Sequence, residues 1–278
     1  MLRSLKDLEQ YAVSASDGDI GHVADFLLDD ERWTVRYLVV ETGGFLDRRE
    51  VLISPISFRD VEWAARRFRL GLTVEKVKHS PSIDTDEPVS RQHEHAYSRY
   101  YGYPMYWGYA DAWGMGIYPG LLADQAWNDL PLDSSGQVAG DVHLRSADEV
   151  RGYHIQGSDD AIGHVDDFIV DDETWGVRYL VIDTSNWWLG KKVLVSPDWI
   201  ESVSWEDRKV HVAMSRHAVK NSPEWDGSRG TTRDYEEHLY DYYGRQRYWA
   251  SDERADPSLH TPAVGSSDGF HPTAGARR

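Results

Sequence analysis

The 278-residue sequence contains no cysteine. Without thiols the chain cannot form disulfide bonds, thiolate zinc sites or iron–sulfur clusters, and it has no cysteine nucleophile. A cysteine-free chain suits a reducing compartment, and we therefore expect a cytoplasmic protein.

Long apolar runs are also missing. No stretch approaches the roughly 20 apolar residues that a membrane-spanning helix needs. The opening residues, MLRSLKDLEQ, lack the apolar core of a signal peptide. We expect a soluble chain with no integral membrane segment, while peripheral association with a membrane complex stays open.

Positive charge is scarce. The chain has 30 Lys and Arg against 47 Asp and Glu, which gives a formal net charge of −17. This charge repels phosphate backbones and disfavours nucleic acid as a partner. Phosphate-binding GxxxxGK[ST], GxGxxG after a strand, GxSxG and HExxH motifs are absent, so the sequence predicts neither a cofactor nor an enzyme.

What the sequence does contain is a long internal repeat. DDERWTVRYLVV, from Asp29 to Val40, returns 142 positions later as DDETWGVRYLVI, from Asp171 to Ile182. The match continues over about 80 residues, which is enough for each copy to close a small core of its own. Within a copy, short β-branched and aromatic runs alternate with turn residues, the pattern of strands. The pattern predicts a mainly β protein: two tandem small β-barrels of about six strands with short helices, packed as a pseudo-dimer.

The segments outside the repeat differ in composition. We predict a first barrel over 1–82, a Tyr/Trp/Gly-rich linker over 83–143 and a second barrel over 144–225. A short helical aromatic appendage follows over 226–249, and the Ser, Asp, Gly and Pro of 250–278 predict a disordered tail. The linker reads as an extended segment that packs only in patches.

Several motifs occur in the same order in both copies. They are IGHV-x-DF, then DD-x-x-W-x-VRYLV, then VL-[IV]-SP, a V-x-W strand and a closing VK-x-SP. This order resembles the PRC-barrel family, which is named for the cytoplasmic domain of the photosynthetic reaction centre H subunit and includes the C-terminal domain of the ribosome maturation factor RimM. The resemblance implies compact barrels of about six strands that dock onto larger assemblies and are not known to catalyse a reaction. The chain is most similar to soluble tandem bacterial members that are reaction-centre H-like.

The resemblance has two departures. An H subunit carries an N-terminal membrane helix, whereas only about ten residues precede the first barrel here. RimM has a different N-terminal domain at the place where this chain has a barrel. Neither parent function therefore transfers directly.

One turn stands out as a candidate contact surface. Trp187, Trp188 and Leu189 occupy the turn of the second copy where the first has Phe45 and Leu46. Large apolar side chains gathered in a turn are typical of an interface with the other barrel, a second copy or a foreign protein. By contrast, the tryptophans that recur at the same barrel positions, Trp33 with Trp175 and Trp63 with Trp205, are interpreted as core residues or packing within each domain.

Charged residues persist inside the apolar strands. Asp25 and Arg36, with Asp167 and Arg178 in the second copy, are interpreted as cross-strand ion pairs that fix strand register. A proton-guiding pair is the alternative. The recurring histidines and the acidic turns lack ligand spacing, so we predict no metal site.

The sequence therefore favours a non-enzymatic interaction or assembly module, with an unknown protein partner and an open oligomeric state that includes a homo-oligomer. Its setting would be the periphery of a photosynthetic or other energy-transducing membrane complex, or a stress response. Two alternatives remain: a RimM-like ribosome maturation factor, and a hydrolase or ligand-binding protein that uses the cleft between the barrels.

Overall fold

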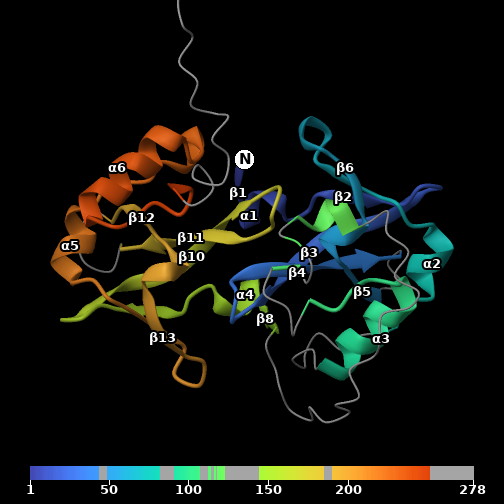
Figure 1. The fold of residues 1–278 in the computed structure, drawn as a ribbon, viewed down its shortest axis with the longest axis horizontal. Helices are drawn as coiled ribbons and strands as arrows, with labels where there is room; N and C mark the ends of the chain where they lie inside the picture. Colours follow the sequence, from blue (N-terminus) through green and yellow to red (C-terminus); the bar gives the residue numbers. More distant parts are fainter. Residues whose placement is uncertain are drawn as a thin grey trace, which may run out of the picture.

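The computed structural model describes residues 1–43, 49–81, 91–106, 112–113, 116, 118–122, 144–184 and 190–250. The protein is mainly β, with two seven-stranded sheets and short helices. We call the elements β1 to α2 unit 1 and the elements β8 to α5 unit 2; Figure 1 shows the two units side by side.

The elements of unit 1 and the segment that follows it are β1 (Leu2–Ser4), α1 (Leu5–Leu8), β2 (Ala12–Ser14), β3 (Asp19–Asp29), β4 (Thr34–Thr42), β5 (Arg49–Ile53), η1 (Pro55–Ser57), β6 (Phe58–Glu62), η2 (Trp63–Ala65), β7 (Arg67–Leu70), α2 (Val74–Lys78), α3 (Arg91–Tyr101) and η3 (Pro119–Leu122). Those of unit 2 and its extension are β8 (Leu144–Ser146), α4 (Ala147–Val150), β9 (His154–Gln156), β10 (Ala161–Asp171), β11 (Val177–Asp183), β12 (Lys192–Val195), η4 (Pro197–Trp199), β13 (Ile200–Ser204), β14 (Lys209–Val212), α5 (Arg216–Asn221), η5 (Gly227–Arg229) and α6 (Arg233–Tyr243).

The two sheets have the same topology. Unit 1 orders its strands β5-β4-β3-β2-β7-β6, and unit 2 orders the corresponding strands β12-β11-β10-β9-β14-β13. Neighbouring strands are antiparallel except for β2 with β7 and β9 with β14, which are parallel. In the described part of the chain no pairing joins the two end strands of either path, so the hydrogen-bonded ladders are open where closed barrels were predicted.

The seventh strand of each sheet comes from the other unit. Strand β1 lies antiparallel to β10, with Leu2 opposite Asp171 and Ser4 opposite Ile169. Strand β8 lies in the same way on β3, with Leu144 opposite Asp29. The units therefore exchange their first strands reciprocally, and Figure 1 places β8 and α4 beside the strands of unit 1.

A tryptophan turn joins the two interiors. Trp175, 2% exposed, follows β10 of unit 2, yet its ring centroid lies 5.2 Å from that of Phe58 and 6.0 Å from that of Phe68, both in unit 1. The main-chain bonds Val35 N to Trp175 O and Val177 N to Trp33 O link the same turns. Trp175 is a core residue, as predicted, but it packs in the interior of the other unit, and the buried side chains of both units form one continuous apolar cluster.

A close approach of two strands explains one recurring motif residue. A Cβ added at Gly21 would lie 1.8 Å from the carbonyl oxygen of Glu41, and one added at Gly163 would lie 2.1 Å from that of Asp183. Only glycine permits this approach of β3 to β4 and of β10 to β11. The glycine of IGHV is therefore required by the sheet in both units.

Each unit carries a helix on its sheet after the repeat. Helix α6 begins at the N-cap Thr232, whose hydroxyl accepts a hydrogen bond from Tyr235 N, and ends at Gly244 in the left-handed conformation. In unit 1 the corresponding helix α3 lies inside the predicted extended linker, and its Tyr97 and Tyr101 are buried. This part of the linker is helical because its tyrosines recur on one face.

Candidate functional site

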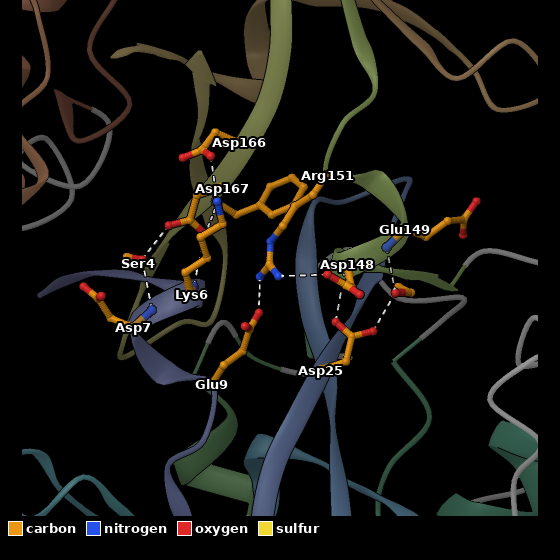
Figure 2. A network of polar contacts seen from close by, with 12 residues as sticks. Ser4, Lys6, Asp7, Glu9, Asp25, Asp148, Glu149, Arg151, Asp166 and Asp167 are labelled. Atoms are coloured by element: carbon orange, nitrogen blue, oxygen red, sulfur yellow. Dashed lines mark hydrogen bonds and ion pairs between the residues drawn. The ribbon is translucent and has the colours of Figure 1, made fainter. Parts of the chain in front are cut away.

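The exchanged N-terminal segment of unit 1 is fastened by one carboxylate of unit 2. Ser4, the N-cap of α1, accepts a hydrogen bond from Asp7 N and donates its hydroxyl to Asp167 Oδ2 at 2.5 Å. The main-chain NH of Lys6 donates to Asp167 Oδ1 at 3.2 Å. Figure 2 shows this network at the seam between the units. Asp167 therefore holds both the cap and the first turn of a helix from the other unit.

The opposite half of the seam repeats this arrangement. Ser146, the N-cap of α4, accepts from Glu149 N and donates to Asp25 Oδ2 at 2.5 Å, while Asp148 N donates to Asp25 Oδ1 at 3.1 Å. Burial raises the pKa of the Asp25 carboxyl above its ordinary value, although the bonds from Ser146 and the main chain act in the opposite direction. Burial raises the pKa of Asp167 in the same way.

The two halves of the seam meet at an ion pair. Glu9 and Arg151 stand 142 positions apart, so they occupy equivalent places in the two units, and they pair with each other. Figure 2 shows their side chains pointing toward one another. Burial raises the pKa of the Glu9 carboxyl, opposed by its contact with Arg151. Opposite charges at equivalent positions favour the pairing of unit 1 with unit 2 over the pairing of like units.

The predicted pair Asp25–Arg36 is not formed. A register shift leaves Asp25 opposite Val39, whereas Arg36 lies toward the other end of β3, beside Asp29. Arg36 Nε and Nη2 donate to Asp29 Oδ2 at 3.0 and 2.5 Å, and both side chains are buried. The correction follows from the register of β3 on β4, which places Arg36 near the Asp29 end of β3, while Asp25 accepts hydrogen bonds from Ser146 and Asp148 of the other unit.

The predicted pair Asp167–Arg178 is corrected in the same way. Arg178 Nη2 lies 3.7 Å from Asp171 Oδ2 and 3.5 Å from the hydroxyl of Thr174. Its guanidinium stacks on the Tyr248 ring at 4.4 Å, and 27% of its side chain is exposed. Its Nε is buried and has no hydrogen-bond partner among the described residues. Arg178 is therefore held more loosely than Arg36.

A buried glutamate ties each appended helix to its sheet. Glu94 of α3 accepts from the Tyr106 hydroxyl at 2.5 Å and the Tyr37 hydroxyl at 3.4 Å. Glu236 of α6 accepts from the Tyr179 hydroxyl at 2.8 Å and, like Glu94, from a tyrosine twelve residues after it. Burial raises the pKa of the Tyr179 hydroxyl. Sequence reasoning missed these glutamates, although both recur at the 142-residue offset.

A cleft opens beside Arg178 at the junction of the units. Its volume is about 840 Å³, and its walls come from the β3–β4 turn of unit 1, Ala112 and Tyr118 after α3, the β10–β11 turn and η4 of unit 2, and the start of α6 with the segment after it. It is lined by both charges, with Glu173 and Asp198 facing the same space as Arg178 and Arg233. Such a volume suits a peptide segment or a mid-sized ligand.

The candidate contact surface of Trp187, Trp188 and Leu189, with Phe45 and Leu46, lies outside the described residues. Across the described ranges no group of three or more metal-ligating side chains comes together. No helix among the described residues has the length and apolar character needed to cross a membrane.

The comparisons with known proteins agree with this duplicated architecture. Residues 2–65 and 143–215 both match the model of the PRC-barrel domain. The two matches start within one residue of the exchanged strands β1 and β8 and include all the seam carboxylates. No curated protein matches the chain.

Proposed function

Since the chain belongs to the PRC-barrel family through both of its units, we propose that it is a non-enzymatic interaction and assembly module. One observation carries the proposal. The reciprocal exchange of β1 and β8 joins two docking domains into one body with a shared interior. Such a body presents two similar surfaces in a fixed relation, which suits the joining of partners in an assembly.

The finer assignment follows from the resemblance. We place this role in the cytoplasm, at the periphery of a membrane energy-transducing complex or in a stress response, in two barrel units packed as a pseudo-dimer. The units would span 1–82 and 144–225, with the linker at 83–143, the appendage at 226–249 and the tail at 250–278.

The proposed contact surface is the turn that contains Trp187, Trp188 and Leu189. Three large apolar side chains in one turn favour protein contact. Phe45 and Leu46 in the equivalent turn of unit 1 would form a second, weaker surface.

The experiment is affinity capture of the full chain from its native cell extract at low and moderate salt. We expect the double variant Trp187→Ala/Trp188→Ala to lose specific partners that the native chain retains. Tyr242→Ala, a change at an exposed tyrosine of α6, is the matched control and should retain them. Unchanged partners and an unchanged oligomeric state in the double variant would contradict the contact surface.

A second candidate, binding of a ligand in the cleft between the units, is favoured by the cavity of about 840 Å³ beside Arg178. Co-sedimentation with ribosomes distinguishes a RimM-like role from both the assembly function and ligand binding in the cleft. The net charge of −17 is unfavourable for the RimM-like role.

A further inference from the structure

Arg36 and Arg178 occupy equivalent positions, but the space beside Arg36 is filled and the space beside Arg178 is open. Beside Arg36 only about 10 Å³ of empty space remains, against about 840 Å³ beside Arg178. Several walls are equivalent at the 142-residue offset, including Ser54 with Ser196 and Tyr106 with Tyr248. One difference between the two places is therefore what occupies the space.

In unit 1 the occupant is a dipeptide from the segment after α3. The carbonyl oxygen of Ala112 accepts a hydrogen bond from Arg36 Nη1. The Trp113 ring lies 5.0 Å from the guanidinium, while the Tyr106 ring lies 3.7 Å from it. Trp113 is 2% exposed, and its Nε1 donates to Thr174 O of unit 2 at 2.9 Å. A carbonyl and an aromatic ring thus complete the surroundings of the arginine.

In unit 2 these two elements are missing from the described residues. Arg178 keeps the tyrosine, Tyr248, at 4.4 Å, but among the described residues no main-chain carbonyl accepts from it and no second ring stacks on its guanidinium. Its Nε has no hydrogen-bond partner in the described part of the chain, and the guanidinium lines the cleft. The offset would place a residue equivalent to Trp113 at Ala255, which has no ring. Among the described residues, Arg178 therefore lacks the carbonyl acceptor and the second aromatic ring that Arg36 has.

We propose that this cleft binds an extended segment of a partner protein that offers a main-chain carbonyl to Arg178 followed by an aromatic side chain, with tryptophan preferred. The guanidinium would then lie near the Tyr248 ring and the ring of the partner, as Arg36 lies near Tyr106 and Trp113. The binding supplies the acceptor that the guanidinium lacks. The inference deepens the proposed function, on which it rests, by naming the chemistry of the partner.

The composition of the chain favours a separate partner over the chain's own end. After Trp249 the sequence contains neither tryptophan nor tyrosine, and its one phenylalanine is Phe270, which follows Asp268 and Gly269. Four carboxylates line the cleft, those of Glu31, Asp171, Glu173 and Asp198, together with the three arginines Arg32, Arg178 and Arg233, and the whole chain has a net charge of −17. A segment with basic residues on either side of the aromatic residue is therefore the best match.

The test uses the full chain and a fluorescently labelled peptide of residues 110–116, ADAWGMG, extended with lysines at both ends. Fluorescence anisotropy should give saturable binding, and the peptide with alanine in place of its tryptophan should bind at least about tenfold more weakly. Arg178→Gln should weaken binding by about the same factor. Arg229→Gln, at an exposed arginine outside the cleft, is the matched control and should bind normally.

A second measurement keeps the inference testable if Arg178→Gln fails to fold. The same peptide with a photoreactive aromatic residue should cross-link to the native chain at cleft residues such as Glu173 and Tyr248. The inference would be overturned by cross-links outside the cleft or by the absence of saturable binding. It would also be overturned if the cleft bound only a second copy of the chain, or if the alanine peptide bound equally well. Partners that survive Arg178→Gln but are lost in Trp187→Ala/Trp188→Ala would sink this inference and leave the proposed function standing.

Discussion

Arg36 and Arg178 occupy the same position of the same strand in two copies of one sequence, and their surroundings have diverged. The Arg36 side chain is fully buried, paired with Asp29 and covered by Trp113, whereas 27% of the Arg178 side chain is exposed, 3.7 Å from its aspartate. The strands are alike, so the difference comes from segments outside the repeat. Divergence after duplication has thus closed one site and left the other accessible.

The largest expected effect tests whether the two arginines differ in their contribution to stability, by replacing each of them. Arg36→Met should lower the free energy of unfolding by about 3–5 kcal/mol, because it leaves the buried carboxylate of Asp29 without its counter-charge. Arg178→Met should cost about 1 kcal/mol or less, because its ion pair is long and partly exposed. Urea denaturation of both variants measures the difference. Equal losses would mean that the two sites are energetically alike.

Removing the ring that fills the site beside Arg36 tests whether the two sites are equivalent. Trp113→Ala should lower stability by about 3 kcal/mol, because it empties the space of a fully packed indole. It should also raise the stoichiometry of the labelled peptide from one to two per chain, since the second site becomes accessible. Tyr242→Ala, at an exposed aromatic of α6 that does not line the cleft, is the control and should change neither quantity appreciably. A stoichiometry of one in the Trp113 variant would show that the sites are not equivalent.

The ion pair between equivalent positions tests how the two units recognise each other. Glu9→Arg should place two guanidinium groups together and lower stability by about 1 kcal/mol or somewhat more, and Arg151→Glu should do the same with two carboxylates. The double exchange should restore most of the loss. Denaturation of the three variants gives the coupling energy. Additive losses in the double variant would exclude a role of this pair in matching the units.

The smallest effect is on the pH dependence of stability. The folded-state pKa values of Asp25 and Asp167 are raised by burial, so their contribution is fully present below the unfolded value of 3.8 and is lost as the pH rises through the folded pKa. The free energy of unfolding of the native chain should therefore decrease as the pH rises toward neutral. Asp25→Asn and Asp167→Asn should each make this decrease smaller. Asp166→Asn should act in the opposite direction, because contacts with Lys192 and Lys6, opposed by burial, lower the pKa of Asp166.

Denaturation of the native chain and these variants over a pH series provides the measurement. The two halves of the seam have the same hydrogen bonds, so Asp25→Asn and Asp167→Asn should give similar changes. A change in only one of them would show that the seam, too, has diverged between the units.

Much of the fold could be predicted because it depends on local pattern. The β-branched runs and the turn residues indicated the strands, and the repeated motifs indicated the PRC-barrel domain that matches both units. The ion pairs were predicted wrongly because the register of β3 on β4 places Asp25 opposite Val39 and Arg36 beside Asp29, and the alternation of residues does not reveal this register.

The candidate site was less predictable because its parts are distant in the sequence. Arg36 meets Ala112 across 76 positions, and Trp113 meets Thr174 across 61. The Tyr/Trp/Gly-rich composition around Trp113 predicted aromatic packing in patches but not its partner. The recurrence of Glu94 as Glu236, and of Tyr37 and Tyr106 as Tyr179 and Tyr248, was the available signal for the tyrosine clusters.

The sequence by itself determined that this protein is duplicated, rich in strands and free of thiol chemistry, because these properties follow from composition, periodicity and local motifs. Only the tertiary structure decided which sheet receives each first strand and which arginine stays accessible. The physical reason is that two equivalent copies offer the same edge to the same strand, so local pattern cannot distinguish pairing within a unit from exchange between units. That choice is made by the packing of the shared interior and by the charges where the units meet.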